Sequence, residues 1–246
     1  MSEEDNKRVV LIAAPPSHGK THSLYKLADD PGVAYLNTDL KDLPFRVPKN
    51  GMKVLKITHP DLALDAIDDL EAEYPEVHTV ILDTVTFLMD MYETQVVQTS
   101  SDTRKAWGGY ATFYKGLMHR VKTSEKNFII LAHAFTEYND DSLSNETRVP
   151  IKGQIGKVGA EADFNIVLSC KKVTLKQLEK EECESEFLNI SKKEERLGFK
   201  YVFQTELTKD TLSEKIRSPM GLWDDNELYI DNDIAHIIQR LAEYYS

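Results

Sequence analysis

The feature that most constrains the fold is the segment A-P-P-S-H-G-K-T at positions 14–21, directly after the apolar run 9–13. A strand before such a segment and a helix after it are the context of a phosphate-binding loop. Gly19 allows close approach of backbone N–H groups to a polyphosphate, Lys20 reaches the β- and γ-phosphates, and Thr21 offers its hydroxyl to Mg²⁺. We predict that the nucleotide-binding residues are Ala14, Pro15, Pro16, Ser17, His18, Gly19, Lys20 and Thr21. Ala14 stands where the usual pattern has glycine, which is tolerated if the backbone there does not need positive φ.

The composition is that of a globular protein, with 41% hydrophobic and 29% charged residues in 246. A net charge of −11 excludes a protein that coats nucleic acid by bulk charge, so any DNA contact requires a local basic patch, ordered loops or an oligomer. The apolar runs are no longer than strands, residues 1–5 are acidic without an apolar signal core, and Cys170 and Cys183 lack metal-ligand spacing. We therefore expect a soluble cytoplasmic protein without membrane contact.

Apolar runs of strand length alternate with helical periodicity along the chain. The predicted strands are 8–13, 33–37, 52–57, 77–82, 127–132, 164–169 and 199–207. The predicted helices are 21–28, 61–74, 86–97, 111–122 and 233–245, with Gly108 and Gly109 interrupting the helical pattern before the fourth of them. This alternation predicts an α/β fold with a mostly parallel central sheet flanked by helices on both faces. We expect a single domain over 1–246, with irregular stretches at 133–159 and 208–231 and a charged insertion at 175–196.

Two carboxylates at predicted strand ends are candidates for the chemistry of a nucleotide site. Asp83 closes the buried run 80–82 and would help to hold Mg²⁺, often through water; alternatively it is an ordinary polar strand end. Asp39 follows the strand 33–37 and would accept a proton from the attacking water if that strand neighbours the first. Alternatively Asp39 caps the turn that follows, and Asp42 is a less favoured substitute.

A histidine and two cations complete the predicted site. His133 ends the apolar run 128–132, where open α/β sheets bind ligands, so it is a candidate sensor of the γ-phosphate; the alternative is a structural histidine. Lys215 and Arg217 flank Ile216, so an extended backbone places both on one face. They would neutralise transition-state charge at the γ-phosphate of a neighbouring subunit, or form a solvated basic turn.

Together these residues resemble RecA-type ATPases, most closely the phage-encoded nucleotide-binding proteins of the recombinase and single-strand annealing type. The resemblance rests on residues 14–21, 80–83, 128–133, 162–168 and 215–221. It implies a RecA-like P-loop NTPase fold and Mg²⁺-dependent, DNA-stimulated ATP hydrolysis, with ATP and Mg²⁺ as cofactors and an active site completed between subunits of a ring or filament. The implied site residues are Lys20, Thr21, Asp83, His133, Lys215 and Arg217; larger members carry glutamate where Asp39 stands. A phage origin would place the protein in the cytoplasm of a bacterial host.

Two segments offer residues for DNA, which we expect to be single-stranded. The first, 101–120, carries Arg104 and Lys105 as cations, with Trp107 and Tyr110 as rings on which bases could stack; alternatively the rings belong to the core. The second segment, 135–159, follows the predicted sensor and carries cations among several acidic residues. Those cations are Arg148, Lys152 and Lys157. A single-strand-binding protein is a further expected partner.

Three functions compete for this set of motifs. The first is an ATP-dependent DNA recombination or annealing protein that assembles with itself. The second is a regulatory or assembly NTPase that binds a protein partner without DNA, which the net acidity favours. The third is a nucleotide or small-metabolite kinase, but its lid would need several arginines, and the candidate stretch 136–157 holds only Arg148.

Overall fold

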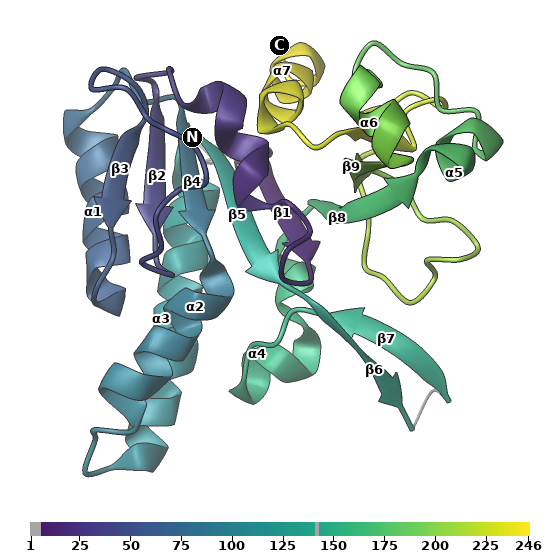
Figure 1. Cartoon of the computed structure of the whole chain (residues 1–246). Helices are drawn as coiled ribbons and strands as arrows, with labels where there is room; N and C mark the ends of the chain where they lie inside the picture. The colour runs from purple at the N-terminus through teal and green to yellow at the C-terminus, as the bar shows by residue number, and fades with distance from the viewer. Residues whose placement is uncertain (1–5, 141–142) are drawn as a thin grey trace.

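The computed structural model describes residues 6–140 and 143–246, so the acidic start at 1–5 lies outside the described residues. The strands of the main sheet lie in the order β10-β9-β8-β1-β5-β4-β2-β3 (Figure 1). Their bounds are β1 Val9–Ala14, β2 Val33–Asn37, β3 Lys53–Lys56, β4 Thr79–Asp83, β5 Asn127–His133, β8 Ile166–Thr174, β9 Phe199–Gln204 and β10 Tyr229–Asp231. The strands from β8 to β3 pair in parallel, whereas β9 and β10 pair antiparallel at one edge.

The strands at the centre of the sheet are buried on both faces. Every residue of β4 is buried, and so are the residues of β5 between its two ends. Parallel strands covered by helices on both faces carry such continuous apolar runs, because neither set of side chains reaches water. The predicted α/β architecture with a mostly parallel sheet is confirmed.

Two layers of helices cover the sheet. One layer consists of α1 (Pro60–Glu73), α2 (Val85–Tyr92) with its π-helical continuation η2 (Glu93–Val97), and α3 (Thr103–Thr123). The other consists of the 3₁₀ helix η1 (Thr21–Leu27) and α7 (Ile234–Tyr244). Alternate residues of β1 enter the two cores: Leu11 packs with the first layer and Ile12 with the second.

The sequence predicted an irregular stretch at 133–159, and this prediction is wrong. It forms a hairpin of β6 (Phe135–Asn139) and β7 (Ser144–Arg148), then α4 (Gly153–Val158) and the 3₁₀ helix η3 (Ala160–Asp163), and the hairpin projects away from the main sheet (Figure 1). Its strands lack apolar alternation, so periodicity could not reveal them. Polar cross-strand pairs connect them instead: the Thr136 and Thr147 hydroxyls lie 2.8 Å apart, and Arg148 pairs with Glu137.

The predicted interruption at Gly108 and Gly109 is also wrong. Helix α3 begins after Asp102, whose side chain accepts a hydrogen bond from the Lys105 N–H, and it passes through both glycines without a break. The buried side chains of α3 explain the continuity, since burial of an apolar stripe outweighs the cost of two glycines. They are Tyr110, Phe113, Tyr114, Leu117, Met118 and Val121.

The charged segment 175–196 is folded against the body of the protein. It contains α5 (Leu175–Lys180) and α6 (Lys192–Leu197), and between them Phe187 is 2% exposed and packs into the core beside α7. Within the part of the chain that the structure describes, every helix is too short or too polar to cross a membrane. Whether the chain forms one domain stays a prediction.

Candidate functional site

The loop after β1 has the backbone conformation that close contact with a phosphate group requires. Gly19 has φ +91°, and a Cβ at this position would lie 2.6 Å from Nδ2 of Asn232. Glycine is therefore needed both for its conformation and for the space. Ser17 also has positive φ, at 63°. Ala14, by contrast, is the last residue of β1, so the alanine that replaces the usual glycine lies in extended backbone and needs no special freedom.

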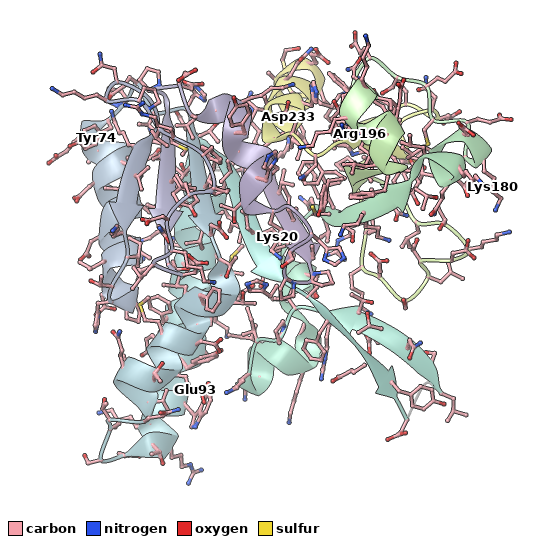
Figure 2. The ribbon with its side chains drawn as sticks, in the orientation of Figure 1. Lys20, Tyr74, Glu93, Lys180, Arg196 and Asp233 are labelled. Carbon is pink, nitrogen blue, oxygen red and sulfur yellow. The ribbon has the colours of Figure 1, made fainter. Side chains whose placement is uncertain are left out.

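Lys20 is buried at the centre of this loop, close to the middle of the molecule in Figure 2. Its ammonium donates to the carbonyl oxygens of Ala14 at 2.7 Å and Pro15 at 3.0 Å, and lies 3.4 Å from Nδ1 of His133. Burial lowers the pKa of Lys20 to about 8, although the nearby Cys170 and Asp83 oppose the shift. A phosphate group would supply the negative charge that this buried ammonium otherwise lacks.

Thr21 and Asp83 meet below the loop, as a magnesium site requires. The Thr21 hydroxyl donates to Oδ2 of Asp83 at 2.8 Å, and the same oxygen accepts the Tyr35 hydroxyl at 2.9 Å. Burial raises the pKa of Asp83, while the hydrogen bonds from Thr21 and Tyr35 oppose that rise. A hydroxyl and a carboxylate are the hard oxygen ligands that Mg²⁺ prefers, and a cation here would balance a largely desolvated charge. These residues therefore fit the ion.

His133 ends β5 directly beside the loop, in register with Ala14 of β1. Burial, followed by the charges of Lys20 and Lys41, lowers the pKa of His133 to about 4, so the ring is neutral at pH 7. Its Nδ1 can then accept a hydrogen bond from Lys20, while the ring meets Phe87 edge-on at 5.1 Å between centroids.

These residues line one pocket of about 620 Å³ at the carboxyl ends of the parallel strands. The loop, Asp83 and His133 form its floor. In open α/β sheets, ligands bind at this edge, next to the ends of the strands. Residues 6–196 of the chain match the AAA domain family.

The chain belongs to the AAA domain family. It is therefore a nucleotide-binding P-loop ATPase, and proteins of this family generally bind ATP with Mg²⁺. No curated protein matches the chain.

Asp39 lines the pocket of this AAA domain, but not for the structural reason that the sequence suggested. The expectation rested on β2 lying next to β1, and this is wrong, because β5 and β4 separate the two strands. Asp39 still lines the pocket, and its charge acts on both Asp83 and His133. It also caps its own turn, accepting the Lys41 N–H at 2.9 Å and pairing with the Lys41 ammonium at 3.1 Å. Asp42 is exposed and does not line the pocket.

Lys215 and Arg217 have partners within their own chain, and neither lines the pocket of Lys20, Asp83 and His133. Lys215 does line a second, neighbouring pocket together with Ala14, Pro15 and His18 of the loop. Ile216 is buried between them, so both cations project outward from a segment that bridges β8 through Val167 and Arg217. Lys215 pairs with Glu146 at 2.5 Å. The Arg217 guanidinium donates to the carbonyl oxygens of Glu161 and, at 3.0 Å, of Phe164. Their action on a neighbouring subunit stays a prediction.

In the first predicted DNA segment, one of the two aromatic rings is buried in the hydrophobic core. Tyr110 is only 2% exposed, and its hydroxyl accepts the Lys152 N–H at 3.3 Å, so the prediction that it stacks with bases is wrong. Trp107 lies against Tyr110, 5.2 Å between centroids, and is partly buried. Arg104 and Lys105 remain exposed at the start of α3. Helical periodicity explains the error, because Tyr110, Phe113 and Leu117 share the inward stripe.

The second predicted DNA segment carries paired cations. Arg148 pairs with Glu137, and Lys152 pairs with Glu93 of η2 at 2.6 Å. Lys157 is exposed on α4. Two of the three cations therefore have acidic partners: Glu137 belongs to the same segment, whereas Glu93 comes from η2 and was not considered in the sequence.

Several residues that contact the loop or line its pocket were not predicted from the sequence. Asn232, after β10, donates to the Gly19 carbonyl at 2.9 Å, and the Cys170 thiol donates to the His18 carbonyl at 2.7 Å. A further wall comes from α6 and β9. Its members are Ser191, Lys193, Glu194, Leu197, Phe199 and Tyr201. The alternation in β9 was visible in the sequence, but nothing there placed that strand beside a loop far earlier in the chain.

Proposed function

We propose that this AAA-domain protein is a Mg²⁺-dependent ATPase that acts on single-stranded DNA, in the manner of phage recombination and annealing proteins. One observation carries the proposal: His133 contacts Lys20 of the phosphate-binding loop, and a projecting hairpin begins at Phe135, two residues later. A nucleotide at the loop would therefore change the surroundings of the residue from which the hairpin extends.

Each residue of the floor has a role in hydrolysis. Lys20 would exchange the Ala14 and Pro15 carbonyls for phosphate oxygens, and Thr21 and Asp83 would hold the metal. Mg²⁺ would neutralise charge on the β- and γ-phosphates when bound. Asp39 would orient the attacking water and accept its proton, and the neutral His133 would report the γ-phosphate to the hairpin.

The remaining parts of the proposal concern assembly. Lys215 and Arg217 would act at the nucleotide of a neighbouring subunit in a ring or filament, after leaving their present partners. Such an assembly would also help a chain of net charge −11 to bind DNA, because it would repeat the local cations that contact the phosphate backbone. Arg104, Lys105 and Lys157 are exposed cations suited to that surface, and a single-strand-binding protein is a further proposed partner.

Substitution of Lys20 tests the enzymatic part of the proposal. We expect Lys20→Ala to abolish ATP turnover without unfolding the protein. The substitution removes the ammonium that would contact the phosphates, but it leaves the hydrophobic cores on both faces of the sheet intact. Lys176→Ala, on the exposed face of α5, is the matched control and should keep full turnover. ATPase assays with and without single-stranded DNA, together with circular dichroism, measure this. Turnover retained by folded Lys20→Ala would contradict the assignment of the loop.

DNA binding tests the coupling through His133. We expect single-stranded DNA to bind more tightly in the presence of a non-hydrolysable ATP analogue, because the analogue would reorganise Lys20, His133 and the hairpin in turn. Fluorescence anisotropy of a labelled oligonucleotide, with and without the analogue, measures the difference. His133→Ala should abolish the difference. Equal affinities in the wild-type protein would refute the coupling.

An alternative function is a regulatory or assembly NTPase that binds a protein and no DNA. The observation that favours it is the ion pairing of candidate DNA cations, Arg148 with Glu137 and Lys152 with Glu93, in a chain of net negative charge. The same anisotropy measurement separates the two functions. ATP turnover without measurable DNA affinity would favour this alternative.

A further inference from the structure

One side of the loop pocket is an aromatic surface that phosphate binding does not explain. Phe199 and Tyr201 are two residues apart on β9, so both project from the same face of the strand. The Tyr201 ring lies against the loop itself, since a Cβ built on Gly19 would be 3.2 Å from Cδ1 of Tyr201. The aromatic surface therefore adjoins the phosphate-binding loop at Gly19.

The surface is aromatic and partly exposed, and the Lys172 ammonium lies 5.2 Å from the centroid of each ring. The two rings meet edge-on at 5.9 Å between centroids, and each remains partly exposed. Leu197, the last residue of α6, lines the same pocket with 47% of its surface exposed. An apolar patch beside a polar, cationic loop is typical of a binding site for a ligand that is charged at one end and flat and apolar at the other.

Several contacts fix this surface relative to the loop. Helix α6 has a capping box between Ser191 and Glu194, and Lys200 connects Glu194, at 2.7 Å, to Asp231, at 3.1 Å. The next residue, Asn232, donates to the Gly19 carbonyl. The wall and the loop are thus joined through a short chain of buried or half-buried polar contacts, as a two-part ligand site requires.

We propose that Tyr201, with Phe199 and Leu197 beside it, stacks against the nucleobase of the bound nucleotide, so that the end of α6 and the start of β9 supply base recognition. This inference rests on the proposed function, because the phosphates of the same ligand occupy the loop. Aromatic side chains bind bases through stacking on the π-face. The residues would contribute to affinity for the nucleoside part and nothing to affinity for the polyphosphate.

The test compares ATP with inorganic tripolyphosphate, which has the phosphates but no base. Isothermal titration calorimetry with Mg²⁺ measures both dissociation constants for the wild-type protein and for Tyr201→Ala. We expect Tyr201→Ala to weaken ATP by about 5- to 100-fold and to leave tripolyphosphate within about twofold. Leu197→Ser, at an exposed position that cannot unfold the core, should weaken ATP less and in the same selective way.

Two controls frame the result. Tyr201→Phe keeps the ring and should keep the ATP affinity, whereas Tyr74→Ala removes a partly exposed tyrosine at the far end of α1 and should change neither ligand (Figure 2). Equal losses for ATP and tripolyphosphate in Tyr201→Ala would mean that Tyr201 acts only through Gly19, and would overturn the inference. Wild-type affinities that are equal for the two ligands would overturn it too, with the phosphate site intact. Absence of binding by both ligands would instead refute the proposed function.

Discussion

Lys20 helps to keep His133 neutral at the site. The ammonium of Lys20 lies 3.4 Å from Nδ1 of His133, and its charge is the second cause, after burial, that lowers the pKa of the histidine to about 4. A neutral imidazole can accept a hydrogen bond from the lysine, whereas an imidazolium would repel it. The proposed sensor is therefore set for one protonation state over the whole physiological range of pH.

The pKa of His133 gives a pH dependence with a definite sign. The folded-state pKa of about 4 lies below the ordinary value of 6.5, so the unfolded chain binds the proton more readily between these values. The contribution of His133 to stability is complete above pH 6.5 and is lost as pH falls toward 4. We expect wild-type unfolding free energy to drop more steeply across this window than that of His133→Gln, measured by urea unfolding at each pH.

The lysine can be tested in the same way. Lys20→Met removes the nearby charge, so the pKa of His133 should rise toward its ordinary value, while burial keeps part of the shift. Lys176→Met, on exposed α5, is the control and should leave the titration of His133 unchanged. NMR titration of the histidine ring protons, assigned with His133→Gln, measures both. An unaltered His133 titration in Lys20→Met would contradict the electrostatic contact.

At the scale of elements, α3 illustrates how packing overrides a local signal. The two glycines predict a break, yet the stripe of buried rings keeps the helix continuous. The two positions nevertheless differ in their surroundings. A Cβ at Gly108 meets nothing within 4 Å, whereas a Cβ at Gly109 would lie 2.8 Å from the Tyr92 hydroxyl.

This difference predicts opposite outcomes for two neighbouring substitutions. Gly108→Ala should raise the free energy of unfolding by about 0.5–1 kcal/mol, because alanine loses less backbone entropy in a helix and the site is open. Gly109→Ala should be at least about 1 kcal/mol less stable than Gly108→Ala, since Tyr92 packs on Tyr110 and Phe113 and must shift. Urea unfolding followed by circular dichroism compares them. Equal gains would mean that the helix is looser here than the structure indicates.

For the whole molecule, the proposed action between subunits depends on the present partners of Lys215 and Arg217. Lys215 and Arg217 lie outside the loop pocket and bind Glu146 and two backbone carbonyls of their own chain. Arg217 therefore has a structural role here whatever it does in an assembly. A role at a neighbouring nucleotide requires both side chains to exchange these partners when subunits associate.

Mixing of inactive variants tests this arrangement. Lys20→Ala lacks its own nucleotide contact, and Arg217→Ala and Lys215→Ala lack the proposed contribution to the neighbour. Lys20→Ala alone should not hydrolyse ATP, and Arg217→Ala and Lys215→Ala alone should hydrolyse it slowly. A mixture of Lys20→Ala with either of the others should recover part of the activity through hybrid interfaces. ATPase assays over a range of protein concentration, with light scattering for mass, measure this. A monomer whose turnover per chain is independent of concentration would rule out action between subunits.

The phosphate-binding loop, the strand that precedes it and the fold class could all be predicted from the sequence. These depend on local chemistry: a glycine, a lysine and a threonine at fixed spacing, and apolar runs long enough for buried strands. The positions of Asp83 and His133 next to the loop could also be predicted, because polar residues at the carboxyl ends of parallel strands converge on one edge of the sheet. No property of the strand 33–37, however, could reveal that β5 and β4 would separate it from β1.

The distant segments that meet at the loop, by contrast, are known only from the folded chain. Tyr201 and Asn232 lie far from Gly19 along the chain, and they contact it because β8, β9 and β10 extend the sheet on that side of β1. Tyr110, which the sequence presented as a ring for DNA, became core because its helical stripe faces inward. Strand order and side-chain burial come from long-range packing, in which the whole sheet and its helices are stabilised together, so neither can be read from a local pattern.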